Sequence, residues 1–381
     1  MLSFEKLPFY IGVLDSPDNK KLPLALPFAL EFDKGLGLIR QRYSEKNEAF
    51  LDSAYKKGSS VSTPLGQGSF GVSRAEDVLK YIVKICGSNF KKSSFLEVGC
   101  GYGYLLHRLK LLEAKNVVGC DPGTDAKQGK KEFGINIIND FYKPDLINEK
   151  FDVILSFGFL EHVKKPLEIV RSFKKILKRR GKIFIAVPNC ENKLKLGDIS
   201  ILGHEHWNFF TAKTLEGILI KGGLSNIKIA FDSRKAMIYG WGEALNHTEN
   251  KNIDDSAELL FNNFSEKVKN ILLYLQTKID KLDRENKTLG LYAGGLQIIG
   301  LLKHKLEPRF FNGDVAIHGK YFPGYINSIE SPENLITNKI DELWIAATDY
   351  DKEITNYLKY KLKIPKDTKI FSFKKYLEEL K

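Results

Sequence analysis

Between residues 94 and 187, short apolar runs alternate with stretches in which hydrophobic residues recur every three or four positions. The short runs are typical of buried strands, and the recurring pattern is typical of amphipathic helices. This alternation predicts an α/β fold with a mainly parallel sheet covered by helices on both faces. We expect strands at residues 94–98, 116–120, 136–138, 151–157 and 182–187. Ligands of such sheets bind at the carboxyl ends of the strands.

The segments on either side of this region show other patterns. Prolines punctuate residues 1–75, where we expect an irregular segment with a helix from about Leu38 to Tyr55. The stretch from Gly58 to Ser73 is rich in Gly and Ser, and we expect it to form a loop that closes over the later site. Apolar positions at helical spacing over residues 256–286 predict one long amphipathic helix, with a coiled-coil helix as the alternative.

A second strand–glycine–helix pattern lies at Gly290–Leu296, and further strands are expected at residues 315–317 and 342–346. Its glycines offer backbone N–H groups to a nucleotide, or they form only a tight packing turn. Both interpretations stay open.

Composition narrows the class of protein. The length of 381 residues predicts two or three domains, and 43% hydrophobic and 28% charged residues are ordinary for a soluble globular protein. We find no signal peptide and no membrane-spanning run, and we expect a cytoplasmic protein. The cysteines, which form no C-x-x-C pair and are expected to be reduced, are Cys86, Cys100, Cys120 and Cys190. The net charge of +12 comes from lysines scattered among glutamates, so we expect no nucleic-acid partner.

The first strand of the sheet runs into Glu97-Val98-Gly99-Cys100-Gly101-Tyr102-Gly103, where three glycines alternate. Glycines let the backbone approach a ligand closely, and the following helix offers unpaired N–H groups. A dinucleotide fingerprint has a third glycine at its sixth position, which is Tyr104 here, so NAD is disfavoured. The motif resembles the first motif of class I S-adenosylmethionine (SAM) methyltransferases. A glycine turn without a ligand is the alternative.

Acidic residues follow the next two strands. Asp121 comes about 20 residues after the glycines, where an acidic residue binds ribose hydroxyls, or it forms a turn that caps the next helix. Asp140 either accepts from an adenine amino group, with Phe141 beside the ring, or forms a plain turn. We therefore expect the cofactor SAM to contact the strand ends at Glu97, Gly99, Gly101, Tyr102, Gly103, Asp121, Pro122, Asp140, Phe141, Ser156 and Phe157.

The fifth strand is followed by Leu202-Gly203-His204-Glu205-His206-Trp207-Asn208-Phe209-Phe210-Thr211. Two histidines at i and i+2 on a loop, with no third partner, are a weak metal signal, so we expect no metal. A helix cap at Thr211 explains the end of this run but not the two histidines and the glutamate. These residues favour a general base with a carboxylate to orient it.

The ordered set of motifs resembles class I SAM methyltransferases, and the His204–Thr211 run resembles the nucleotide-sugar C-methyltransferase family. The resemblance implies that His206 and Glu205 transfer the proton and that His162, in Leu-Glu-His-Val, is a further catalytic histidine. The family's tyrosine before this run is replaced by Gly203, and its N-terminal zinc-binding cysteine module has no counterpart here.

The last third is also similar to that family, which implies a second, smaller Rossmann-like C-terminal domain. The expected parts are an N-terminal substrate or lid segment (1–75), a SAM-binding methyltransferase domain with a doubly wound sheet (76–245), a connecting helix (246–288) and the Rossmann-like domain (289–381). We expect the acceptor to contact His204, Asn208, Tyr292 and Lys320.

The predicted function is SAM-dependent methyl transfer to a carbon or an oxygen atom of a nucleotide-linked sugar. His206 removes a proton from the acceptor, Glu205 orients His206, and His162 polarises the acceptor oxygen. The alternatives are O-methylation of another small or glycan acceptor, an NAD(P)-linked oxidoreductase, and a SAM-fold binding protein without turnover. A kinase-like glycine loop at Gly66–Val72 lacks the other kinase motifs. We expect a small-molecule partner and no membrane, and the sequence does not define the sugar or the oligomer.

Overall fold

The computed structural model describes residues 1–10, 12–17, 23–56, 69–244 and 256–380. They belong to two compact units, each assembled from separated segments. The central unit comprises Glu31–Glu191 and Glu205–Glu258, and the terminal unit comprises Met1–Leu30, Asn192–His204 and Leu259–Lys381. The chain therefore does not divide into the four consecutive parts that we expected.

The central unit holds a seven-stranded sheet in the order β10-β11-β8-β7-β4-β5-β6. Its strands are β4 (Ser94–Val98), β5 (Asn116–Cys120), β6 (Asn136–Ile138), β7 (Phe151–Phe157), β8 (Leu177–Pro188), β10 (Ser225–Phe231) and β11 (Met237–Glu243). The first five run parallel in the order of a doubly wound fold, and β11 is antiparallel beside β8. All five predicted strands are confirmed, although β8 begins earlier than expected, at Leu177.

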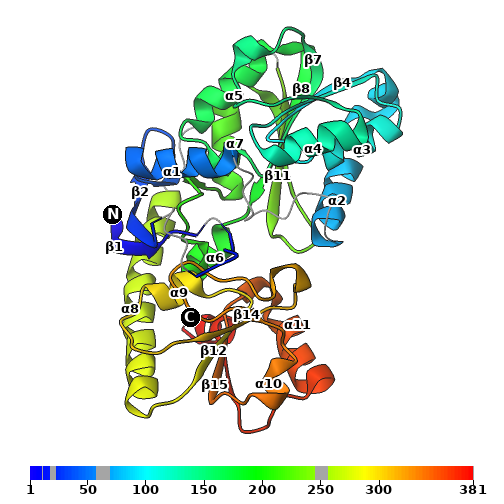
Figure 1. The fold of residues 1–381 in the computed structure, drawn as a ribbon. Helices are drawn as coiled ribbons and strands as arrows, with labels where there is room; N and C mark the ends of the chain where they lie inside the picture. Colours follow the sequence, from blue (N-terminus) through cyan, green and yellow to red (C-terminus); the bar gives the residue numbers. More distant parts are fainter. Residues whose placement is uncertain (11, 18–22, 57–68, 245–255, 381) are drawn as a thin grey trace. The chain divides into compact units, whose positions relative to one another are not determined.

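Helices cover both faces of this sheet (Figure 1). One face packs on α2 (Ser69–Cys86), α3 (Tyr104–Leu111) and α4 (Thr124–Phe133), and the other packs on α5 (Pro166–Lys175) and α7 (Ala212–Lys221). Successive strand residues point to opposite faces. Phe95 accordingly joins the core under α2 and α3, whereas Leu96 joins the core under α5 and α7. Both cores are apolar, so the sheet is buried on both sides.

The N-terminal segment is more regular than we expected. It forms β1 (Leu2–Pro8), β2 (Ala25–Asp33), β3 (Leu38–Gln41) and α1 (Glu45–Lys56). β1 pairs antiparallel with β2, and β3 pairs with β9 (Asn208–Phe209), so the helix predicted from Leu38 is wrong for residues 38–44. Of the predicted loop from Gly58 to Ser73, residues 57–68 lie outside the described part of the chain, and Ser69 already begins α2.

The terminal unit holds a five-stranded parallel sheet in the order β14-β13-β12-β15-β16. Its strands are β12 (Leu289–Tyr292), β13 (Arg309–Phe311), β14 (Ile329–Glu330), β15 (Glu342–Ile345) and β16 (Lys369–Ser372). This arrangement confirms a second, smaller Rossmann-like domain. The strand expected at residues 315–317 is wrong, because the Asp314 side chain accepts from the Ala316 N–H and caps a 3-10 turn there.

Helices complete the terminal unit and the connections to it. They are α6 (Glu191–Leu196), α8 (Ser256–Arg284), α9 (Leu296–Gly300), α10 (Asn334–Thr337), α11 (Asp351–Asn356) and α12 (Phe373–Glu379). The long helix predicted from the apolar spacing is confirmed as α8. Within the described ranges, no helix has the length and apolar character to cross a membrane. All four cysteines are free thiols.

We predict that Gly129→Ala lowers the free energy of unfolding by about 1–3 kcal/mol. Gly129 lies in α4, and an added Cβ would come within 1.7 Å of the Tyr102 carbonyl oxygen in the glycine loop. Gly217→Ala, in α7, is the matched control because its Cβ would meet no atom within 4 Å. The control should stabilise the protein by about 0.5–1 kcal/mol. Urea unfolding followed by circular dichroism measures both, and equal stabilities would contradict the close packing of α4 on this loop.

Candidate active site

The glycine loop joins β4 to α3 through Gly99, Gly101 and Gly103, whose φ angles are 78°, 49° and 80°. Side chains are strained in this left-handed region, whereas glycine is not. An added Cβ at Gly99 would lie 2.8 Å from Phe159 Cβ, but one at Gly101 would meet no atom within 4 Å. The loop is therefore closely packed at Gly99 and open at Gly101, where a ligand has room to approach the backbone.

Asp121 follows β5 and faces the glycine loop. The Gly101 N–H donates to its Oδ2 at 2.9 Å, and the Gly123 N–H donates to its Oδ1 at 2.8 Å. Burial raises the pKa of Asp121, and these two N–H groups lower it. The contact with Gly123 is the turn that we considered as an alternative. The contact with Gly101 places the same carboxylate beside the loop, and each oxygen keeps a lone pair for a ligand.

Asn139 was not among the predicted site residues, yet it holds this turn in place. Its Nδ2 donates to the carbonyl oxygens of Asp121 and Gly123, both at 2.9 Å. Its position beside Asp140 at the end of β6 was the available signal. Asn139 therefore positions Asp121 from the neighbouring strand.

Glu97 is a buried carboxylate next to the same loop. Its residue is 1% exposed, and its Oε2 has no hydrogen-bond partner in the described part of the chain. Burial raises the pKa of Glu97 well above its ordinary value, and the nearby Asp121 raises it further. A buried polar atom without a partner costs about 1–3 kcal/mol, so the position suits a ligand group that supplies one.

The remaining predicted cofactor residues differ in where their side chains lie. The Tyr102 ring packs on Phe133 with centroids 5.3 Å apart, and its hydroxyl donates to Glu132, so it is directed to α4. Asp140 is exposed and accepts from the Phe141 N–H at 2.7 Å, as in a plain turn.

Pro122 lies in the Asp121 turn, while Ser156 and Phe157 end β7. Ser156 is buried, and its Oγ has no partner within the described ranges. Phe157 belongs to the apolar core under α2 and α3. The structure thus gathers Glu97, Asp121 and the glycines but turns the side chains of Tyr102 and Phe157 elsewhere.

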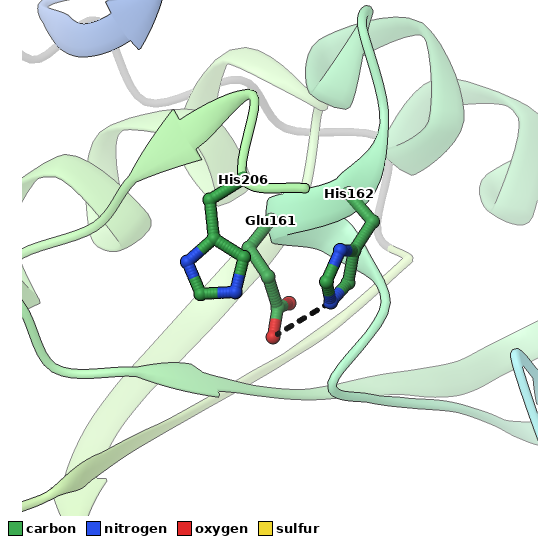
Figure 2. A group of neighbouring side chains, drawn as sticks. All are labelled: Glu161, His162 and His206. Atoms are coloured by element: carbon green, nitrogen blue, oxygen red, sulfur yellow. Dashed lines mark ion pairs between the residues drawn. The ribbon is translucent and has the colours of Figure 1, made fainter. Parts of the chain in front are cut away.

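A cluster of Glu161, His162 and His206 lies beyond β7 (Figure 2). The first two belong to the 3-10 turn η3 (Leu160–His162), and His206 lies in the loop before β9. Glu161 Oε1 is 3.8 Å from His162 Nε2, and the two imidazole centroids are 4.9 Å apart with an interplanar angle of 75°. Glu161 was not predicted, although it stands within the Leu-Glu-His-Val segment. Phe159, which packs at Gly99, directly precedes this turn.

Burial keeps two members of this cluster neutral near pH 7. It raises the pKa of Glu161 to about 8 and lowers the pKa of His162 to about 4. His162 Nδ1 lies 3.0 Å from the Glu205 carbonyl oxygen. Because a carbonyl oxygen only accepts, a hydrogen bond to Glu205 requires the proton on Nδ1, and this tautomer leaves the Nε2 lone pair for the cluster.

Tyr55 of α1 brings a hydroxyl to the same histidine. Its Oη lies 3.1 Å from His162 Nδ1 although the residues are 107 positions apart in sequence. Burial and then the carboxylate of Glu205 raise the pKa of Tyr55 well above its ordinary value, so the hydroxyl stays protonated near neutral pH. Sequence reasoning missed Tyr55, because nothing in the helix that we expected to end there indicates a contact with a residue 107 positions away.

The loop that carries Glu205 and His206 is anchored to η3. The Trp207 N–H donates to the Glu161 carbonyl oxygen at 2.8 Å. Asn208 is 1% exposed, and its Nδ2 donates to the carbonyl oxygens of Leu160 at 3.1 Å and Val163 at 2.7 Å. Its Oδ1 accepts from Arg40 Nε at 3.2 Å. We expected Asn208 to contact the acceptor, but these bonds give it a positioning role instead.

His204 also differs from the expectation that it contacts the acceptor. It belongs to the terminal unit and is 2% exposed. Its ring packs against Phe9 and Phe28, with centroids 5.4 and 5.3 Å away, and its Nε2 lies 3.2 Å from the Leu7 carbonyl oxygen. His204 is thus part of an apolar interior.

The other two predicted acceptor contacts also belong to the terminal unit. Tyr292 ends β12 in an apolar cluster, where burial raises its pKa to about 12. Lys320 forms a 3.7 Å ion pair with Asp15. Their contact with an acceptor stays a prediction.

We predict that Asn208→Ala lowers the free energy of unfolding by about 2–4 kcal/mol, because two carbonyl oxygens lose their donor in a buried place. Asn116→Ala is the control, since Asn116 Nδ2 bonds Glu149 at the surface, 3.2 Å away. That change should cost less than about 0.5 kcal/mol. Chemical denaturation measures both variants. A difference below 1 kcal/mol between them would argue against the anchoring role of Asn208.

Comparisons with known proteins find methyltransferases. A family model described as a methyltransferase domain matches residues 72–229. The ubiquinone biosynthesis O-methyltransferase of Actinobacillus pleuropneumoniae serotype 7 is 36% identical over 140 residues, which cover 34% of this chain and 58% of that protein. The tRNA U34 carboxymethyltransferase of Campylobacter fetus is 30% identical over 109 residues, which cover 26% of this chain and 37% of that protein.

The chain thus spans little more than half the length of the first of these relatives. Among solved structures, the magnesium protoporphyrin IX methyltransferase of Synechocystis is similar at 12% identity with a TM-score of 0.40. The likeness covers 54% of this chain and 100% of that one. The family match coincides with the doubly wound sheet and the glycine loop described above. Residues 72–229 therefore form a class I SAM-dependent methyltransferase domain.

Proposed function

We propose that the chain is a cytoplasmic SAM-dependent methyltransferase. It transfers a methyl group to a carbon or an oxygen atom of a nucleotide-linked sugar. The position of the Glu161–His162–His206 cluster supports this proposal most. Two of its members lie in η3, and Phe159, which directly precedes η3, packs at Gly99 of the cofactor loop. Methyl transfer needs donor and acceptor in line and one group to take the acceptor's proton. A cluster of basic nitrogens beside the cofactor loop meets both needs.

The residues around the glycine loop fit SAM, which supplies a methyl group on a sulfonium. The unpaired Glu97 Oε2 suits the ammonium group of the ligand, because a cation supplies the missing partner and favours the charged carboxylate that burial alone disfavours. The open space at Gly101 suits the close approach of the ligand to the backbone. Asp121, held against that backbone, offers its lone pairs to ribose hydroxyls.

On the acceptor side, His206 takes the proton and Glu205 orients the histidine. The tautomer of His162 changes the role that we expected for it. With the proton on Nδ1, Nε2 accepts a hydrogen bond from an acceptor hydroxyl and does not polarise its oxygen by donating. His162 Nε2 and His206 would therefore both accept a hydrogen bond or the proton from the acceptor hydroxyl.

A second candidate is O-methylation of another small acceptor. The relative from Actinobacillus, named for ubiquinone biosynthesis, favours it at 36% identity over 140 residues. The terminal unit, with its parallel five-stranded sheet, favours the sugar acceptor that the family resemblance implies. The two candidates differ in the acceptor but share the cofactor and the cluster.

We predict that Glu97→Gln weakens SAM binding by about ten- to a hundredfold, because an amide lacks the charge that pairs with an ammonium group. The free energy of unfolding of the ligand-free protein should not fall, because Glu97 Oε2 loses no partner. Glu113→Gln, at a surface pair with Lys91, is the control. Isothermal titration calorimetry gives the affinities. Wild-type affinity in Glu97→Gln would exclude the carboxylate from the SAM site.

We predict that His206→Ala lowers kcat by about 10²–10⁴ and leaves SAM affinity intact. Mass spectrometry of products from labelled SAM and a panel of nucleotide sugars detects the added methyl group, and NMR then locates it. His304→Ala, a half-exposed histidine of the terminal unit, is the control. If His206→Ala lost SAM binding and turnover to the same extent, the assignment of His206 as the catalytic base would be overturned. No methylated product from any sugar of the panel would count against the sugar acceptor.

A further inference from the structure

We propose that Glu161, His162 and His206 bind one divalent transition-metal cation, which holds two adjacent oxygens of the acceptor for O-methylation. Each residue offers one ligand atom, and these atoms all lie within 4.8 Å of one another. The three side chains converge from η3 and from the loop before β9 (Figure 2). The role of the cation rests on the proposed function, whereas its binding does not.

The distances are close to those of a bound ion. First-row cations hold imidazole nitrogens and carboxylate oxygens at about 2.0–2.2 Å, so two ligand atoms of one ion lie at most about 4.4 Å apart. Glu161 Oε1 and His162 Nε2 are 3.8 Å apart and already satisfy this limit. Two ligand atoms that lie as far apart as 4.8 Å need to come closer by about half an ångström, and small side-chain rotations provide this movement.

The surroundings prepare these atoms for a cation. A metal-binding histidine usually donates its other ring N–H to a carbonyl or carboxylate oxygen, which fixes the tautomer. His162 Nδ1 has this partner in the Glu205 carbonyl oxygen at 3.0 Å, so Nε2 is directed to the cluster with its lone pair. Glu161 is 3% exposed, and its Oε2 is without a hydrogen-bond partner within the described ranges. An unpaired buried carboxylate oxygen is the donor that a cation would engage.

The backbones that carry the ligands are tied together before any ion arrives. The Trp207 N–H, next to His206, donates to the Glu161 carbonyl oxygen at 2.8 Å. This bond joins the two segments at the cluster itself. The site is thus set by the fold rather than assembled by the ligand, which favours affinity.

The donor set indicates the class of cation. Two imidazoles and one carboxylate suit Zn²⁺, Mn²⁺, Fe²⁺, Co²⁺ and Ni²⁺, whereas Mg²⁺ and Ca²⁺ prefer oxygen ligands throughout. Three protein ligands leave coordination positions open, as catalytic sites require. Two adjacent hydroxyls of a sugar fit two such positions, so the site selects a diol.

Coordination of the acceptor hydroxyl lowers its pKa, and its proton passes to water. The oxygen then forms a bond to the methyl carbon while the bond from sulfur to that carbon breaks, and SAM leaves as S-adenosylhomocysteine. In this scheme His206 serves as a ligand, and the cation replaces direct proton removal by its ring. The scheme also selects oxygen over carbon as the methylated atom.

Cobalt(II) is the probe for this site, used on the full chain without a histidine tag after treatment with a chelator. We expect one Co²⁺ per chain by elemental analysis, with visible d–d absorption. His206→Ala and Glu161→Gln should each weaken Co²⁺ binding by about tenfold or more. Both variants should bind SAM with wild-type affinity, which shows that the fold is kept. His304→Ala should bind Co²⁺ as the wild type does.

Binding of less than one equivalent of Co²⁺, Zn²⁺ and Mn²⁺ by the wild type would overturn the site, as would unchanged binding in both variants. Methyl transfer, assayed in parallel, separates this inference from the proposed function. Transfer that persists at full rate in metal-free protein would overturn the cation's role and leave the methyltransferase proposal standing. If the wild type binds one Co²⁺ and both variants lose it, the metal site is supported, whether or not a sugar is methylated. The absence of any methylated sugar would contradict only the proposed acceptor.

Discussion

The missing side chain at Gly99 determines how closely the glycine loop after β4 approaches the segment that carries Glu161 and His162. An added Cβ there would lie 2.8 Å from Phe159 Cβ, so only glycine allows this contact. Phe159 directly precedes the turn that carries Glu161 and His162. Reacting atoms must come within about 3–3.5 Å in good alignment. The packing of two loops at one glycine thus brings both halves of the chemistry to one edge of the sheet.

Local patterns predicted those parts of the fold that local physics decides. The five parallel strands are mainly apolar runs between helical patterns, and their identity does not depend on a distant partner. β1 and β2 were missed because Pro27 interrupts an alternation in which Leu26, Phe28 and Leu30 are buried. The boundaries of the two units were not predicted, because two of them fall inside β2 and α8, where no linker marks them. Discontinuous units of this kind leave no signal in neighbouring residues.

The motifs predicted which segments form the site better than which side chains act in it. His204 and His206 stand two residues apart, yet one packs on Phe28 in the terminal unit and the other joins the cluster of the central unit. Glu161 lies inside a predicted motif, but its burial depends on the η3 turn. Tyr55 reaches His162 from 107 residues away. Such contacts have no characteristic spacing, so only the folded chain reveals them.

Bonds directly after the Glu205–His206 segment leave it little freedom within the central unit. The Trp207 N–H donates to the Glu161 carbonyl oxygen, and Asn208 Nδ2 donates to the carbonyl oxygens of Leu160 and Val163. The entropy of ordering His206 is therefore lost in folding and not at each turnover. Packing does not force the glycine before this segment, because an added Cβ at Gly203 would meet no atom within 4 Å. The hydroxyl beside His162 comes from Tyr55 of α1, whose Oη lies 3.1 Å from Nδ1 of that histidine.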